Sequence, residues 1–165
     1  MNNPIPTWFS TVERRSLLLQ IAAAWEGTPF FANSEAPGRD GGVDCVRLLH
    51  AVYSAAGVIP RIDIPRQVMD HGQHSDRSLL IEAFETWPAL KDRFARMPHC
   101  GYEILSGDAL CFRAGKVPHH AGVMLVDDDV LHVLAPSGVH RTRLAAVIRG
   151  HSLVGRLEAV FRPLP

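Results

Sequence analysis

The sequence predicts an α+β domain in which helices of the N-terminal half, including one that begins at a cysteine, pack on a C-terminal antiparallel sheet. Up to about residue 97 the apolar residues recur at helical spacing. From Ser106 onward, short alternating runs separated by turn residues predict strands. The 165 residues are most simply one domain, spanning residues 1–165, because this length buries a sizeable core.

Four helices are expected before Ser106. The first is capped by Ser10, in a capping box with Glu13, and presents one apolar face. That face comprises Leu17, Ile21, Ala24 and Trp25. The second is capped by Asp44 and ends at Gly57. The third begins near Asp76 or Ser78 and ends near Trp87, and a shorter one spans Pro88 to Met97. The polar stretch between them, Arg61 to Ser75, is expected to be an irregular surface loop.

The strands are expected at 109–113, 121–126, 130–134, 139–142 and 154–162. The three aspartates at 127–129 mark a hairpin turn between the second and third strands. The segment 144–148 fits either a strand or a helical turn.

Charge and cysteine content exclude several classes of protein. The 17 Lys and Arg residues balance the 17 Asp and Glu residues, so neither nucleic acid nor a membrane surface is an expected partner. The three cysteines are widely spaced and form no CxxC pair, which indicates neither a zinc knuckle nor a disulfide framework. No cofactor is expected.

The N-terminal region contains the apolar run Ser16 to Ala24 after two arginines. Glu13 precedes this run, Gln20 interrupts it, and Trp25 follows where a signal peptide has small residues. No apolar run reaches the roughly 20 residues that span a bilayer. We therefore expect a chain that is cytoplasmic as made, without a signal peptide or a membrane span.

The stretch from Gly41 to Leu49 has the pattern of a reactive cysteine at a helix start. A glycine-rich approach leads to Asp44, a good helix cap, and Cys45 follows in the first turn. The free N–H groups and the positive end of the helix dipole lower the pKa of a nearby thiol. Cys45 is therefore a candidate nucleophile, and an inert buried cysteine is the alternative.

A cysteine nucleophile needs a base, and the base needs an orienting partner. If the hairpin turn comprises the three residues 126–128, His132 lies opposite Gly122 and is the diagonal neighbour of His120. Gly122 has no side chain, which leaves room for the two imidazoles to meet. His119 points to the other face, so His120 is the expected base and His132 its partner.

Several blocks of the sequence, in order, resemble the NlpC-type cell-wall peptidases, a family of papain-like cysteine peptidases. The blocks are Gly27-Thr28-Pro29-Phe30, Val43-Asp44-Cys45, Gly107-Asp108-Ala109-Leu110-Cys111-Phe112, His120-Ala121-Gly122-Val123-Met124-Leu125 and Leu131-His132-Val133. The resemblance covers about residues 25–138. The inserted segment 61–97 and the C-terminal residues 158–162 look most like the branch found in phage tails and gene-transfer particles.

The resemblance implies a single papain-like cysteine peptidase domain with Cys45 as nucleophile, His120 as base and His132 as third residue. It also implies hydrolysis of amide bonds in peptidoglycan stem peptides. Phage-tail-like proteins would be further partners, and a phage-like particle would deliver the chain to the cell wall.

Three further residues are candidates for substrate binding: Phe30, Asp44 and Arg47. Asp44 is most simply the helix cap, with a substrate amine as a second ligand. Arg47 is either solvated or bound to a substrate carboxylate.

Val46 and Arg47 stand where the family has Ser-Gly. This departure leaves two alternatives open: a non-catalytic wall-binding or tail module that keeps the fold, and a related papain-like amidase or acyl transferase.

Metal binding is not expected. His71, His74, His99 and Cys100 match no standard zinc spacing. The aspartates at 127–129 lack the other ligands of a calcium loop.

Overall fold

The computed structural model describes residues 5–68, 76–148 and 150–165. Three α-helices lie in these ranges: α1 (Val12–Trp25), α2 (Cys45–Ala55) and α4 (Leu79–Thr86). A short 3₁₀ helix, η1 (Val154–Arg156), precedes the last strand. No helix in the described ranges is both long enough and apolar enough to cross a membrane.

A six-stranded antiparallel sheet forms the centre of the molecule, in the order β3-β10-β4-β5-β6-β7. Its strands are β3 (Phe94–Arg96), β4 (Ala109–Arg113), β5 (Pro118–Met124), β6 (Asp129–Leu134), β7 (Gly138–Arg143) and β10 (Leu157–Pro163). Two small hairpins accompany it, β1 (Glu35–Ala36) with β2 (Gly42–Val43), and β8 (Val147–Ile148) with β9 (His151–Ser152). The expected α+β fold class, with the cysteine helix on an antiparallel sheet, is confirmed.

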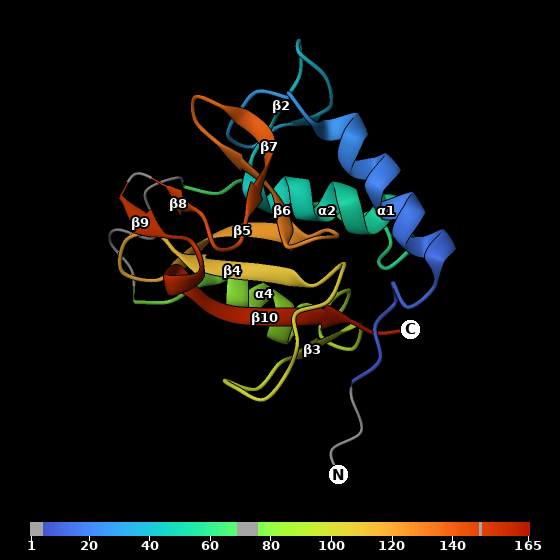
Figure 1. Cartoon of the computed structure of the whole chain (residues 1–165). Helices are drawn as coiled ribbons and strands as arrows, with labels where there is room; N and C mark the ends of the chain where they lie inside the picture. Colours follow the sequence, from blue (N-terminus) through green and yellow to red (C-terminus); the bar gives the residue numbers. More distant parts are fainter. Residues whose placement is uncertain (1–4, 69–75, 149) are drawn as a thin grey trace.

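Helix α2 packs against β5 and β6, and α1 packs against α2 (Figure 1). The main core lies on this side of the sheet and includes Leu48 and Val52 of α2. A second, smaller core on the other face contains Leu110, Phe112 and Val160. The first residue of α2, Cys45, is thereby brought against the start of β5.

Helix α1 differs from the expectation in its cap and its face. Thr11, and not Ser10, is the N-cap, and its hydroxyl accepts a hydrogen bond from the Arg14 amide. The buried residues are Leu18, Ala22 and Trp25, while Leu17 is exposed. The predicted face was therefore only partly right: Trp25 is buried and Ile21 packs against the core, but Leu17 and Ala24 are exposed. Apolar residues occur almost all round this helix, so spacing alone does not choose one side.

The segment Pro88 to Met97 was expected to be helical, and this prediction was wrong. It consists of turns followed by β3, which pairs with β10 at the edge of the sheet. Phe94 lies edge-on to Tyr53 and Phe84. Pairing with a strand more than 60 residues later and packing of this ring override the local helical pattern.

Other expectations hold. Ser78 caps α4, and Gly57, with a φ of 76°, follows the end of α2. The segment 144–148, for which two structures were open, contributes the strand β8. The loop from Arg61 is irregular as far as the structure describes it, to residue 68.

The block Gly107-Asp108 has a structural role. Asp108 is fully buried and forms an ion pair with Arg162 of β10, with 2.8 Å between Nη2 and Oδ2. Arg162 also donates to the carbonyl groups of Ile5 and Glu103. The C-terminal strand is thus tied to the turn that begins β4.

Candidate active site

Cys45 is the first residue of α2, and its position is set by the cap before it. Asp44 has an extended backbone, and its Oδ1 accepts a hydrogen bond from the Arg47 amide at 2.9 Å. The Cys45 thiol lies against the backbone of β5, with Sγ 3.7 Å from the carbonyl oxygen of His119. The helix start therefore holds the sulfur at the strand that carries the predicted base.

Asp44 does more than cap the helix. Its Oδ2 accepts from the Asn33 amide at 2.7 Å and from Nη1 of Arg47 at 3.0 Å. Both charged side chains are buried. The second guanidinium nitrogen of Arg47 donates to the carbonyls of Ile64 and Pro65. The solvated alternative for Arg47 was wrong, because Arg47 anchors the loop after α2 from inside the protein.

Asn33 also binds the loop that follows α2, through Gln67. Its side-chain oxygen accepts from the Gln67 amide at 2.7 Å, and its side-chain nitrogen donates to the Gln67 carbonyl at 3.1 Å. Asn33 has a φ of 58°, a left-handed conformation that asparagine adopts more readily than most residues. The sequence motif alone did not identify Asn33 as part of this network.

His120 and His132 meet as predicted. Gly122 pairs with His132 in the β5–β6 ladder, and Nε2 of His120 lies 3.0 Å from Nδ1 of His132. A Cβ at Gly122 would lie 2.6 Å from Val130 Cγ1 and 3.3 Å from His132 Cβ. Glycine is therefore required for the close approach at this point.

The next strand adds two residues that were not predicted. His140 of β7 pairs with His132, and their ring centroids are 4.6 Å apart. Two residues on, Thr142 lies with its Oγ1 2.8 Å from Nε2 of His132. Side chains alternate between the two faces of β7, so His140 and Thr142 both lie on the face that carries His132. A predicted register for the β6–β7 hairpin would therefore have identified them as neighbours of His132.

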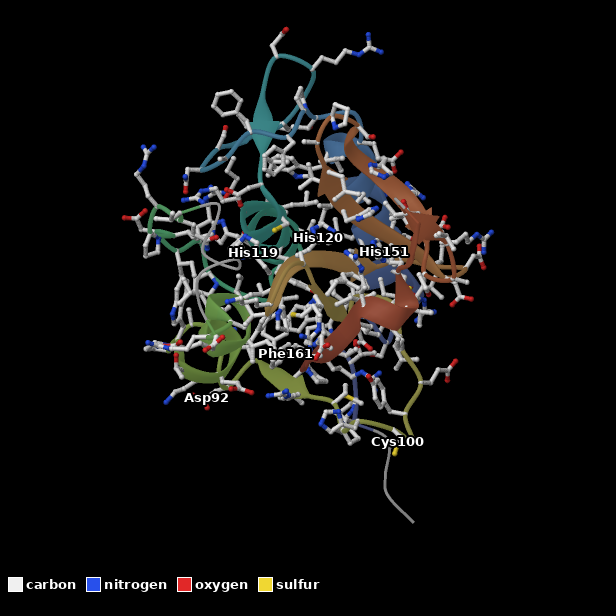
Figure 2. All side chains as sticks on the ribbon, turned by 90° about the vertical axis from the view of Figure 1, so that its left-hand side faces the viewer. Asp92, Cys100, His119, His120, His151 and Phe161 are labelled. Atoms are coloured by element: carbon white, nitrogen blue, oxygen red, sulfur yellow. The ribbon has the colours of Figure 1, made fainter. Side chains whose placement is uncertain are left out.

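A cavity of about 480 Å³ opens beside these groups. Its lining includes Phe30, Cys45, His120 and His132, together with residues of the β8–η1 region such as Ile148 and Arg156. Figure 2 shows His119 and His120 in the middle of this face of the molecule, with His151 to one side. None of the described lining residues is Asp or Glu.

Burial sets the protonation of the site. It raises the pKa of Cys45 to about 12, and the neighbouring Asp44 carboxylate adds to the effect. It lowers the pKa of His120 to about 4 and that of His132 to about 3, with smaller contributions from the surrounding histidines. The prediction of a lowered thiol pKa was wrong, because desolvation outweighs the helix dipole and the N–H groups at the helix start. At neutral pH the resting site holds a neutral thiol and two neutral imidazoles.

The predicted site residues thus fall into two groups. Phe30, Cys45, His120 and His132 line one cavity. Asp44 and Arg47 face each other in the network behind it, and their binding of substrate stays a prediction.

The candidate metal ligands are not brought together in the described residues. His71 and His74 lie outside the described ranges. Asp127 and Asp128 form the tight turn between β5 and β6, each with a positive φ.

Comparison with known proteins identifies the fold. No family model and no curated protein matches the sequence. Solved structures do match, among them an NLP/P60-family protein similar to a lipoprotein from Staphylococcus aureus, with a TM-score of 0.60 and 19% identity. The match covers 100% of this chain but 45% of that protein, so the chain spans under half of its length.

Two further structures agree. The peptidoglycan hydrolase RipB from Mycobacterium tuberculosis matches with a TM-score of 0.53 and 15% identity over 99% of this chain and 73% of its own. NlpC1 from Trichomonas vaginalis matches with a TM-score of 0.53 and 13% identity over 95% of this chain and 46% of its own. The chain therefore has the papain-like fold of NlpC/P60 proteins.

Proposed function

We propose that this protein is an NlpC-type cysteine peptidase that hydrolyses amide bonds in peptidoglycan stem peptides. The observation that carries the proposal is the contact of 3.0 Å between His120 and His132 in the cavity that Cys45 also lines. The NlpC/P60 fold supports the choice of substrate, since a structure of this fold is described as a peptidoglycan hydrolase.

The contacts of His120 decide which nitrogen acts as the base. Nε2 faces His132, so Nδ1 is the nitrogen left to take the proton of Cys45. In neutral His120, Nδ1 must then be bare, with the proton on Nε2. Because the resting pair is neutral, proton transfer accompanies attack of the sulfur on the substrate.

The reaction then follows a Cys–His course. The sulfur forms a bond to the carbonyl carbon while His120 receives the thiol proton. Backbone N–H groups at the start of α2 are suited to stabilise the oxyanion. His120 gives its proton to the departing amine as the C–N bond breaks. Water, deprotonated by His120, then cleaves the thioester, and the proton returns to sulfur.

Turnover of defined stem peptides tests the proposal. Products are separated by mass for the wild type, Cys45→Ser and Cys100→Ser. Cys100 is a suitable control because it is exposed and lies far from His120 on the face shown in Figure 2. We expect no hydrolysis by Cys45→Ser and full activity of Cys100→Ser. Hydrolysis that survives in Cys45→Ser would exclude the cysteine mechanism.

A non-catalytic wall-binding module is the second candidate. The observation in its favour is that Val46 and Arg47 stand where the family has Ser-Gly, with Arg47 paired to Asp44 and bound to the Ile64 carbonyl inside the protein. Sedimentation with purified cell walls distinguishes the two. A binding module sediments equally well as wild type and as Cys45→Ser and releases no peptide, whereas the peptidase releases peptides in the wild type only.

Within this proposal, we assign the chain to the phage-tail and gene-transfer-particle branch, made in the cytoplasm and carried to the wall by such a particle. The inserted segment 61–97 supports this choice. An antibody against the chain should detect it in purified particles of the producing strain. Its presence only in the particle-free fraction would contradict the assignment.

A further inference from the structure

Both ring nitrogens of His132 are engaged, and the ring is fully buried. Nδ1 faces Nε2 of His120 at 3.0 Å, and Nε2 faces the hydroxyl of Thr142 at 2.8 Å. A neutral imidazole has one donor nitrogen and one acceptor nitrogen, so its two contacts are coupled. The choice of protonated nitrogen in His120 therefore determines which nitrogen is protonated in His132.

The proposed function supplies that condition. His120 acts as a base through Nδ1 only when its Nε2 carries the proton and donates to Nδ1 of His132. His132 then carries its own proton on Nε2, and that N–H donates to Thr142 Oγ1. A hydroxyl can accept or donate, so Thr142 satisfies this arrangement without a change in its position.

We propose that Thr142 is a positioning residue, which acts through His132 to support the positive charge that His120 acquires during catalysis. The inference rests on the proposed function. When His120 takes the thiol proton, it becomes a stronger donor to His132, which in turn donates more strongly to Thr142. The hydroxyl therefore ends a chain of three hydrogen-bonding groups that is polarised by the new charge.

The surroundings explain why this support matters. The titratable groups that act on the two histidines are Cys45, His119 and His140, and the lining of the cavity adds the cationic or titratable side chains of Arg113, His151 and Arg156. None of these supplies a negative charge at neutral pH. No carboxylate occurs among the described residues that line the cavity. The charge on His120 is thus stabilised by dipoles, of which the Thr142 hydroxyl is the last.

Thr142 offers a substitution that preserves the shape of its side chain. It lies half-buried on β7, the edge strand of the sheet, so valine keeps the β-branched shape and removes only the hydroxyl. Thr142→Ser keeps the hydroxyl and removes the methyl group. Thr86→Val, at an exposed helical site, is the matched control.

The experiment measures kcat, KM and the pH profile on a defined stem peptide. We expect Thr142→Val to lower kcat about tenfold with little change in KM, as loss of one supporting hydrogen bond predicts. The acidic limb of the kcat/KM profile should move to lower pH, because protonated His120 has lost support. Thr142→Ser should restore both values. If Thr142→Val only loosened the packing, water would enter the site and the acidic limb would move to higher pH, towards the ordinary histidine pKa. That result would contradict the proposal.

The ¹⁵N resonances of the imidazoles provide a second readout that does not need turnover. In the wild type, Nε2 of His132 should be the protonated nitrogen, and in Thr142→Val the titration of His120 should move to lower pH. Wild-type kinetics and an unmoved titration in Thr142→Val would overturn the role of Thr142. Absence of any Cys45-dependent hydrolysis in the wild type would instead refute the proposed function, and the resonances would still test the hydrogen-bonded chain.

Discussion

The two halves of the candidate site differ in whether their side chains are charged. The helix half, behind Cys45, is a buried ionic network of Asp44, Arg47 and Asn33 that ties α2 to the loop 61–68. The sheet half is a chain of neutral groups, from His120 through His132 to Thr142. The permanently charged side chains stabilise the structure around α2. The histidines, whose charge changes in the proposed reaction, have neutral hydrogen-bonding partners. Breaking each half in turn should therefore have different consequences.

The largest effect is expected from Asp44→Ala. It leaves Arg47 as an unpaired buried charge, which typically costs about 3–5 kcal/mol of folding free energy. Urea unfolding measures the loss. The double variant Asp44→Ala/Arg47→Met should recover much of it, because neither charge of this pair remains. Equal stabilities of the single and double variants would show that the ion pair does not carry the effect.

The sheet half should make the protein sensitive to acid. The pKa values of His120 and His132 are lowered to about 4 and about 3, so below pH 6.5 the unfolded chain binds more protons than the folded one. The contribution of these histidines to the free energy of unfolding is therefore fully present above about pH 7. It falls as the pH drops towards 3, by about 1.4 kcal/mol per pH unit for each histidine.

Unfolding by urea between pH 7 and pH 4 gives this slope. His132→Gln should reduce it, whereas substitution of the exposed His99 should leave it unchanged. An identical slope in His132→Gln would show that other groups cause the acid sensitivity.

A smaller effect is expected from Gly122→Ala. The new methyl group would lie 2.6 Å from Val130 Cγ1 and 2.9 Å from the Leu131 carbonyl oxygen. Overpacking of this kind costs about 1–3 kcal/mol. It should also shift His132 and lower the turnover of stem peptides. Gly155→Ala, whose nearest contact is 3.3 Å, is the control. Unchanged melting temperature and turnover would show that β5 and β6 adjust freely.

The most local effect should come from Asn33→Ala, which removes the two hydrogen bonds to Gln67 and the contact with Arg47 Nη1. Each such bond contributes about 1 kcal/mol. The loss should be local, so hydrogen exchange of the Gln67 amide should accelerate while exchange in β5 and β6 does not. Uniform acceleration across the sheet would contradict a local role.

The sequence predicted the sheet half of the site more fully than the helix half. A hairpin register is local, so the turn 126–128 and the period of two were enough to place His132 opposite Gly122. The contacts of Asn33 with Gln67 and of Arg47 with Ile64 join a loop to a loop across the start of α2. Such contacts leave no periodic signal in the sequence.

The wrong predictions have physical causes of the same kind. The strand β3 depends on a partner far along the chain, and the buried face of α1 depends on what packs against it. The thiol pKa depends on how much water is removed from Cys45, which no helix-start motif encodes. Thr142 was missed because the expected strand 139–142 was not aligned with its neighbour.

The histidine pair and the cysteine also differ in how the chain brings them together. His120 and His132 are separated by 12 residues within one hairpin, whereas the Cys45 thiol meets a carbonyl 74 residues away. Short loops close at a lower entropic cost, so the hairpin can assemble before α2 docks on it. A chain at that stage of folding would possess a base without a nucleophile. The candidate site would then be completed at one of the last steps of folding, so the proposed peptidase would stay inert while it is being made.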